Sequence, residues 1–156
     1  QELGARFRDT SGIPGLLYWR KFCAESPDLD IGEVMQASSV VPLSSAEIAA
    51  YNAPFPDQRY MAGARRFPSL IPLFHDEPEV EENKAAWAVL ARFDKPFMTA
   101  FADHDPVTAG ADIKFQQVVP GARGVAHRTI ENAGHFLQQE QPLHCVQALL
   151  NVMGRS

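Results

Sequence analysis

Two short segments of this sequence carry side chains that can act together in acid–base chemistry. The first is Ala-Asp-His-Asp-Pro at 102–106, and the second is Glu-Asn-Ala-Gly-His-Phe at 131–136. We expect Asp105 and His135 to pair, because a carboxylate that accepts a hydrogen bond from one ring nitrogen leaves the other nitrogen able to take a proton. Such a pair can serve as a general base. Asp103 is the alternative acid, and its other interpretation is a short carboxylate that caps the turn.

Each segment follows a stretch with the pattern of a buried strand. Residues 96–101 form a short apolar run, and residues 125–130 alternate between apolar and polar side chains. Helical patterns surround these strands at 79–93, 108–118 and from Pro142 onward. This order predicts parallel strands with crossover helices, which is an α/β architecture. Because functional groups gather beyond the carboxyl ends of parallel strands, about 4.8 Å apart, we expect Asp105 and His135 to meet there.

The first half of the chain has a different composition. Residues 1–78 hold eight of the 12 prolines, and proline removes the hydrogen bonds of a helix interior. The sequence therefore predicts short helices, at 14–24, 44–51 and 57–67. The second of them starts with a capping box formed by Ser44 and Glu47. We expect residues 1–78 to form a mainly helical cap and residues 79–156 to belong to the α/β core.

The predicted sheet has only two strands, whereas a stable parallel sheet needs both faces covered and neighbours at its edges. The chain also begins with Gln1, and it contains no glycine-flanked turn that would present a nucleophile between a strand and a helix. These features favour the C-terminal part of a longer protein. We expect the 156-residue chain by itself to have no catalytic turnover.

The overall composition excludes several kinds of partner. A net charge of −5 disfavours binding to nucleic acid or to an anionic membrane surface, since both require clustered Lys and Arg. No apolar run is long enough to span a bilayer, and nothing near the start has a secretory pattern, so we expect a cytoplasmic protein. Cys23 and Cys145 lie far apart without metal-ligand spacing, which predicts two reduced core thiols, with a disulfide as the alternative, and no metal site.

Three segments together resemble the haloalkane dehalogenases of subfamily I, in the α/β-hydrolase superfamily. Residues 51–68 are similar to the signature of that family's cap domain. Residues 101–106 resemble its acid loop, with Ala102 where many members have glycine or serine, and residues 133–138 resemble its histidine loop. The acid precedes the histidine, as in the triads of the superfamily. The similarity covers essentially the whole chain in the same order.

The resemblance implies the C-terminal part of an α/β-hydrolase fold and a two-step dehalogenation. An aspartate nucleophile, which this sequence does not contain, would expel a halide ion from a small halogenated aliphatic substrate and form an alkyl-enzyme ester. Water activated by His135 and Asp105 would then hydrolyse the ester to an alcohol. The resemblance implies neither a metal nor an organic cofactor.

The resemblance also assigns residues of the cap. Trp19 stands where the family donates an N–H to the leaving halide, on which charge develops in the transition state. Positions that line the family's substrate pocket are matched by Leu16, Phe67, Pro68 and Ile71. The competing interpretation of all five residues is ordinary core packing.

Other functions stay open at this point. An epoxide hydrolase shares the fold, the aspartate nucleophile and the histidine-activated water, and it binds the epoxide oxygen with two cap tyrosines, for which Tyr18, Tyr51 and Tyr60 are candidates. Another α/β-hydrolase, such as a serine ester hydrolase, is compatible as well. A non-catalytic remnant or interaction module would have kept the acid and the base by chance. The residue at the nucleophile position distinguishes these alternatives.

Overall fold

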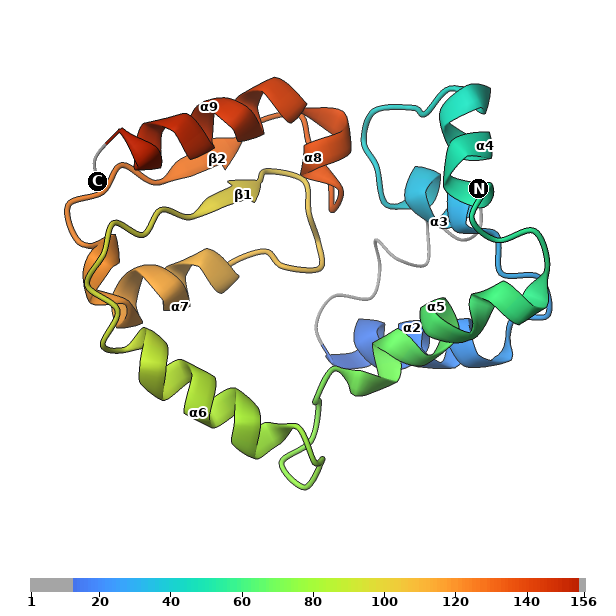
Figure 1. Cartoon of the computed structure of the whole chain (residues 1–156), viewed down its shortest axis with the longest axis horizontal. Helices are drawn as coiled ribbons and strands as arrows, with labels where there is room; N and C mark the ends of the chain where they lie inside the picture. The colour runs from blue at the N-terminus through green and yellow to red at the C-terminus, as the bar shows by residue number, and fades with distance from the viewer. Residues whose placement is uncertain (1–12, 155–156) are drawn as a thin grey trace. The chain divides into compact units, whose positions relative to one another are not determined.

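The structure of the chain is a computed structural model, and it describes residues 13–154 (Figure 1). The chain divides into two compact units, with the break between Val80 and Glu81. Within the described residues, no helix is both long enough and apolar enough to cross a membrane.

The first unit consists of short helices, as its many prolines predict. Its elements are α2 (Ile13–Glu25), α3 (Ile31–Ala37), α4 (Ser45–Asn52), the 3₁₀ helix η1 (Gln58–Met61), α5 (Ala62–Arg66) and the 3₁₀ helix η2 (Phe67–Leu70). The predicted capping box of α4 is confirmed. The Ser44 hydroxyl accepts a hydrogen bond from the Glu47 backbone N–H at 3.3 Å, and the Glu47 carboxylate accepts one from the Ser44 N–H at 2.8 Å.

Two features of this unit differ from the sequence prediction. The stretch predicted as one helix at 57–67 is divided into η1, α5 and the start of η2. Gly63 lowers helix propensity in its middle, and Pro68 removes a backbone donor at its end. Helix α3 was not predicted, because its seven residues are too few to show a clear periodicity. It is capped by the Asp30 carboxylate, which accepts from the Glu33 N–H at 2.9 Å.

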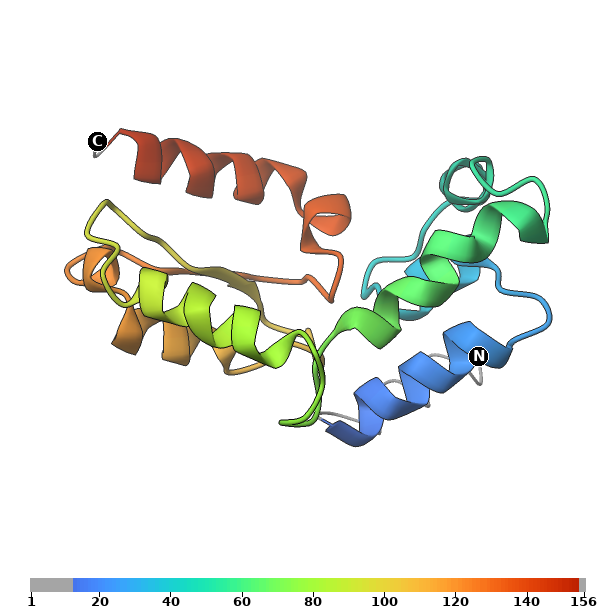
Figure 2. The ribbon, with the colours of Figure 1, turned by 60° about the horizontal axis from the view of Figure 1, so that its bottom comes forward.

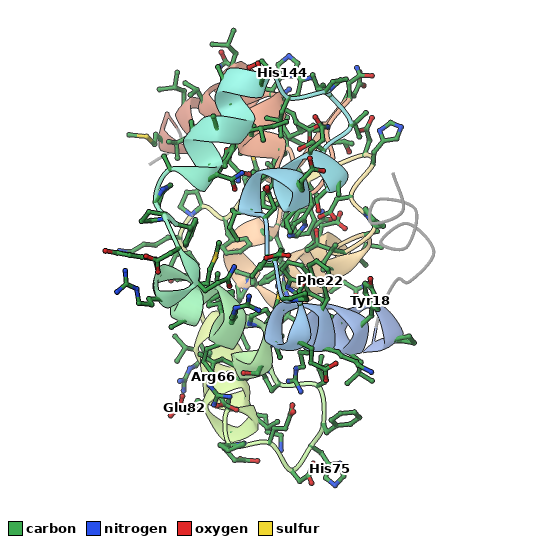
Figure 3. All side chains as sticks on the ribbon, turned by 90° about the vertical axis from the view of Figure 1, so that its right-hand side faces the viewer. Tyr18, Phe22, Arg66, His75, Glu82 and His144 are labelled. Atoms are coloured by element: carbon green, nitrogen blue, oxygen red, sulfur yellow. The ribbon has the colours of Figure 1, made fainter. Side chains whose placement is uncertain are left out.

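A small apolar cluster lies inside the first unit. Leu29, Val34 and Met61 are buried in it, and the partly buried side chains that pack against it are Trp19, Phe22, Ile31, Phe55 and Ala64. The rings of Tyr18 and Trp19 stack on Phe22 with centroids 6.2 and 5.8 Å away. Tyr18 and Phe22 are labelled on α2 in Figure 3. The first unit therefore has an apolar core of its own.

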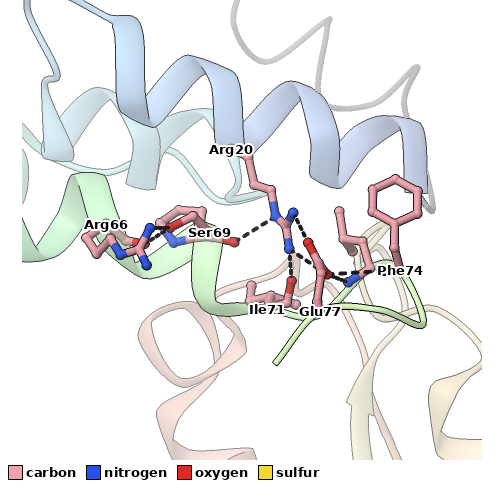
Figure 4. A network of polar contacts seen from close by, with 8 residues as sticks. Arg20, Arg66, Ser69, Ile71, Phe74 and Glu77 are labelled. Carbon is pink, nitrogen blue, oxygen red and sulfur yellow. Dashed lines mark hydrogen bonds and ion pairs between the residues drawn. The ribbon is translucent and has the colours of Figure 1, made fainter. Parts of the chain in front are cut away.

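An arginine network holds the segment that follows η2 against α2 (Figure 4). The Arg20 guanidinium donates to the Glu77 carboxylate at 2.7 and 3.2 Å, to the Pro68 carbonyl at 3.2 Å and to the Ile71 carbonyl. Glu77 also accepts from two backbone N–H groups, those of Leu73 and Phe74. The Arg20 hydrogen bond above all, and then the backbone ones, hold the pKa of Glu77 at about 2. The network is thus ionised at neutral pH.

The second unit is an α/β arrangement around a parallel pair of strands. Its elements are α6 (Val80–Leu90), β1 (Ala100–Ala102), α7 (Ala111–Val118), the 3₁₀ helix η3 (Pro120–Ala122), β2 (Arg128–Ile130), α8 (Leu137–Glu140) and α9 (Pro142–Met153). The predicted parallel pairing is confirmed, with Phe101 opposite Thr129 in register. Helix α9 lies over one face of the strands, and α6 and α7 lie over the other (Figure 2).

Both strands are shorter than predicted. The run at 96–101 becomes a strand only at Ala100, because the residues before it bond elsewhere: the Phe97 N–H donates to the Gly121 carbonyl at 3.0 Å. The Gly121 N–H in turn donates to the Phe93 carbonyl at 2.9 Å. The chain before Ala100 therefore bonds to η3 and does not extend the pairing of β1 with β2. Helix α8, which follows His135, was not predicted either.

Candidate active site

Two loops meet beyond the carboxyl ends of β1 and β2. The acid loop (residues 103–108) follows Ala102, and the histidine loop (residues 131–136) follows Ile130. Backbone hydrogen bonds continue from the strands into the loops: the Asp103 N–H donates to the Ile130 carbonyl at 3.1 Å, and the His104 N–H donates to the Ala133 carbonyl at 3.0 Å. The loops are therefore held side by side, as the parallel topology requires.

The structure brings Asp105 and His135 into contact. His135 Nδ1 lies 3.1 Å from one carboxylate oxygen of Asp105 and 3.2 Å from the other. Asp105 is buried, whereas the side chain of His135 is 34% exposed. The acid is thus shielded from solvent, and the imidazole is accessible to water, as a general base must be.

Two neighbours in the acid loop orient the Asp105 carboxylate. The Val107 backbone N–H donates to one oxygen at 2.8 Å, and the Thr108 hydroxyl donates to the other. Sequence analysis missed the role of Thr108, although the spacing of an aspartate and a hydroxyl three residues later is typical of such a turn. Each carboxylate oxygen of Asp105 therefore accepts a hydrogen bond from within the acid loop, in addition to its contact with His135.

The charge on Asp105 determines which nitrogen of a neutral His135 ring carries the hydrogen. Burial raises the pKa of Asp105, but the hydrogen bonds from His135, Thr108 and Val107 outweigh burial and hold the pKa at about 2. An ionised carboxylate only accepts hydrogen bonds, so Nδ1 carries the hydrogen when the ring is neutral. Nε2 is then the nitrogen that can take a proton.

Asp103, the alternative acid, has different partners. Its carboxylate accepts from the backbone N–H groups of Asn132 at 3.0 Å and Ala133 at 3.1 Å, and it lies 2.7 Å from Nδ1 of His104. The structure thus supports the interpretation of Asp103 as a turn cap, and it is Asp105 that contacts His135.

A second support of the histidine loop comes from the helices that follow it. The Gly134 N–H donates to the Glu140 carboxylate at 2.7 Å, and the Gln141 side-chain amide donates to the Asn132 carbonyl at 3.1 Å. Sequence analysis missed Glu140, because nothing in its spacing distinguishes it from any other exposed helix carboxylate. Among the residues the structure describes, no three His, Cys, Asp or Glu side chains are grouped so that they could hold a metal ion.

The cap residues singled out by the sequence all lie in the first unit. Trp19 packs against the cluster of Leu29, Val34 and Met61. Pro68 is buried, Leu16 and Ile71 are half-buried, and the Phe67 side chain is 66% exposed. The Arg20 network joins α2 to η2 and Ile71, so these residues lie on adjacent elements of one unit. Their roles toward a substrate stay predictions.

Comparison with solved structures identifies the class of the fold. The haloalkane dehalogenase DpaA from Paraglaciecola agarilytica NO2 is similar with a TM-score of 0.75 at 24% identity, over 90% of this chain and 47% of that chain. The haloalkane dehalogenase DbeA from Bradyrhizobium elkani USDA94 is similar with a TM-score of 0.68 at 21% identity, over 99% of this chain and 52% of that chain. The fold is that of part of an α/β-hydrolase.

Comparison of sequences finds haloalkane dehalogenases as well. A haloalkane dehalogenase of Psychrobacter cryohalolentis is 50% identical over 127 residues, which are 81% of this chain and 42% of that protein. One of Mycobacterium marinum is 44% identical over 122 residues, 78% of this chain and 41% of that protein. No protein-family model matches the chain. Over about four fifths of its length the chain is similar to haloalkane dehalogenases, and it spans about two fifths of the length of these curated relatives.

Proposed function

We propose that this chain supplies the acid and the base of an enzyme that hydrolyses haloalkanes to alcohols and halide ions. The observation that carries the proposal is the contact between Asp105 and His135, at 3.1 Å, beyond the ends of two parallel strands. The sequence relationship to haloalkane dehalogenases supports the choice of reaction.

The reaction has two steps. In the first, the carboxylate of an aspartate outside this sequence attacks the carbon that bears the halogen; a carbon–oxygen bond forms, and the halide leaves with the electron pair of the broken bond. In the second, His135 Nε2 takes a proton from water while the water oxygen attacks the carbonyl carbon of the ester. The bond between that carbon and the oxygen of the alkoxy group then breaks. The alkoxy group leaves as the alcohol with the remaining hydrogen of the water, the carboxylate is regenerated, and the proton on Nε2 passes to solvent. Asp105 stabilises the imidazolium that forms on the way.

The first unit has the role of a cap in this proposal. Trp19 donates its ring N–H to the departing halide, and the substrate pocket is lined by Leu16, Phe67, Pro68 and Ile71. The indole packs on the cluster of Leu29, Val34 and Met61, which supports a fixed ring position. Because no segment of the sequence has the form of a nucleophile turn, the 156-residue chain alone is expected to lack turnover.

The test measures halide release from a primary bromoalkane by the full-length protein that carries this sequence. His135→Ala removes the water-activating base, so we expect one burst of halide and no further turnover. His144→Ala, on the exposed first turn of α9, is the matched control and should leave turnover unchanged. Normal steady-state turnover by the His135→Ala variant would show that His135 is not the base.

The same assay tests the halide ligand. Trp19→Phe keeps a ring against the apolar cluster but removes the N–H, so it should slow the burst itself, by on the order of a hundredfold. An unchanged burst rate would show that Trp19 does not donate to the departing halide. Hydrolysis of an aliphatic epoxide but not of the bromoalkane would favour the epoxide hydrolase alternative.

A further inference from the structure

The Asp103 carboxylate is a bridge between the two loops that hold the catalytic pair. One of its oxygens accepts from the Asn132 N–H at 3.0 Å, and the other accepts from the Ala133 N–H at 3.1 Å. Asp103 lies two residues before Asp105, and Ala133 lies two residues before His135. A single side chain thus joins the acid loop to the histidine loop immediately next to the pair.

The backbone at the far end of this bridge is unusual. Asn132 has a φ of 55°, in the left-handed region that residues other than glycine rarely adopt. A left-handed residue in a turn can make successive backbone N–H groups converge, and the resulting concave nest binds an anion. The N–H groups of Asn132 and Ala133 are successive, and both donate to the Asp103 carboxylate, as they would to an anion in such a nest. Ala133, completely buried, follows directly.

The charge required for this contact is present. Burial raises the pKa of Asp103, but the hydrogen bonds from His104, Asn132 and Ala133 together outweigh burial and hold the pKa at about 2. Asp103 therefore stays a carboxylate at neutral pH, and hydrogen bonds from backbone N–H groups to an ionised acceptor are stronger than neutral ones. The contact with His104, whose side chain is 58% exposed, also lowers the pKa of Asp103, but the two backbone N–H groups bond to the carboxylate independently of it.

We propose that Asp103 is a positioning residue, whose carboxylate holds Asn132 in its left-handed conformation and thereby places His135 for ester hydrolysis. The inference rests on the proposed function. Asp103 does not touch the imidazole; it acts through the backbone two residues before it. Because displacement of a catalytic group by about 1 Å can cost on the order of a hundredfold in rate, a loosened histidine loop should slow the step that uses His135.

A purely structural turn cap would behave differently from a positioning residue. Loss of a cap lowers the melting temperature and affects both steps of the reaction alike. Loss of the positioning contact leaves the first displacement intact, since that step does not use His135, and slows only the hydrolysis of the ester. The ratio of burst rate to steady-state rate therefore separates the two roles.

The experiment uses the full-length protein and compares Asp103→Ala with Asp103→Asn and His104→Ala. For Asp103→Ala we expect a normal burst of halide followed by turnover about ten- to a hundredfold slower. Asp103→Asn should be intermediate, because the amide oxygen can accept from one N–H while its NH₂ group faces the other. His104→Ala removes the exposed partner and keeps both backbone contacts, so its turnover should match that of the unmodified protein.

A rescue variant tests the backbone conformation directly. Glycine adopts the left-handed region without a Cβ penalty, so adding Asn132→Gly to Asp103→Ala should recover part of the lost turnover. The position of the His135 hydrogen, read from ¹⁵N chemical shifts, should be fixed on Nδ1 in the unmodified protein and mixed in Asp103→Ala.

Three results would overturn the inference: unchanged turnover in Asp103→Ala, equal slowing of burst and turnover, or no recovery with Asn132→Gly. Each can occur while His135→Ala still gives a burst without turnover, so failure of the inference is distinct from failure of the proposed function. Normal turnover in His135→Ala would instead contradict the proposed function, and the inference that rests on it would fail as well.

Discussion

The two units of this chain are stabilised in different ways. The first encloses an apolar cluster around Met61 and adds polar contacts between neighbouring helices, such as the Arg20 network. The second has a short parallel ladder, and its polar contacts gather in the two loops beyond it. Large side chains on α9 stay exposed, namely Leu143, Val146, Leu149, Leu150 and Met153.

The first unit is thus organised around an apolar core, and the second around the polar contacts of the candidate active site. In the first unit, burial of apolar surface and local caps hold short helices together. In the second, carboxylates with depressed pKa values hold backbone N–H groups and an imidazole at fixed distances. These hydrogen-bonded loops of the second unit are also where the chemistry is proposed to occur. Each unit contains one tryptophan among the described residues. In the second unit the ring of Trp87 packs on Phe115, with centroids 5.0 Å apart, and Trp19 lies in the first unit. The fluorescence of single-tryptophan variants therefore reports on each unit separately.

The largest expected effect is that of Gly121→Ala. A Cβ at this position would lie 1.8 Å from the Lys95 carbonyl oxygen, so the chain around η3 must move. Overpacking typically costs about 1–3 kcal/mol, and a clash with backbone belongs at or above the upper end of that range. Unfolding followed through Trp87 should shift strongly toward lower denaturant, while unfolding followed through Trp19 should not. Equal shifts at both tryptophans would contradict the separation of the units.

The second prediction concerns acid. Burial raises the pKa of Asp105, but its hydrogen bonds lower it from the ordinary 3.8 to about 2, so in this range the unfolded chain binds more protons than the folded one. The stability that Asp105 contributes is complete above about pH 4 and is lost as the pH falls toward 2.

Asp105→Asn removes the titrating group of this pair. The slope of stability against pH between about 4 and 2, followed through Trp87, should therefore decrease, whatever the change in absolute stability. The slope followed through Trp19 should persist, because Glu77 in the first unit also has its pKa lowered to about 2 by Arg20 and backbone N–H groups. An unchanged slope at Trp87 would contradict the contribution of Asp105.

The smallest expected effect is that of Gly63→Ala, the counterpart of Gly121→Ala in the first unit. A Cβ at Gly63 in α5 would have no neighbour within 4 Å, so alanine fits there without a clash. Alanine in a helix is more stable than glycine by roughly 0.5–1 kcal/mol, so the Trp19-reported unfolding should shift to higher denaturant. A loss of stability would show that α5 is not a regular helix in solution.

Local signals predicted much of this structure. The Ser44–Glu47 capping box, the parallel pairing of the strands and the approach of Asp105 to His135 depend on short motifs or on topology, both of which can be read from sequence. The strand predicted at 96–101 begins only at Ala100, because the residues before it bond to η3. That contact spans more than twenty residues of sequence, so no local pattern predicts it.

The contacts around the site were harder to predict than the pair itself. The Glu140 carboxylate reaches the Gly134 N–H only because α8 turns back on the loop, and the nest at Asn132 depends on one backbone angle. Asp103 was recognised as either acid or cap, and its partners in the folded chain distinguish these roles. Such contacts are properties of tertiary structure, which composition and periodicity do not contain.

The most direct test of the proposed chemistry is the mass of the His135→Ala variant after reaction with a primary bromoalkane. In the full-length protein that carries this sequence, the ester should form and then persist, because the base that activates water is missing. We expect the intact protein to gain the mass of one alkyl group in place of one hydrogen, with the adduct mapped to a single aspartate. Absence of any adduct, together with normal turnover, would contradict the account.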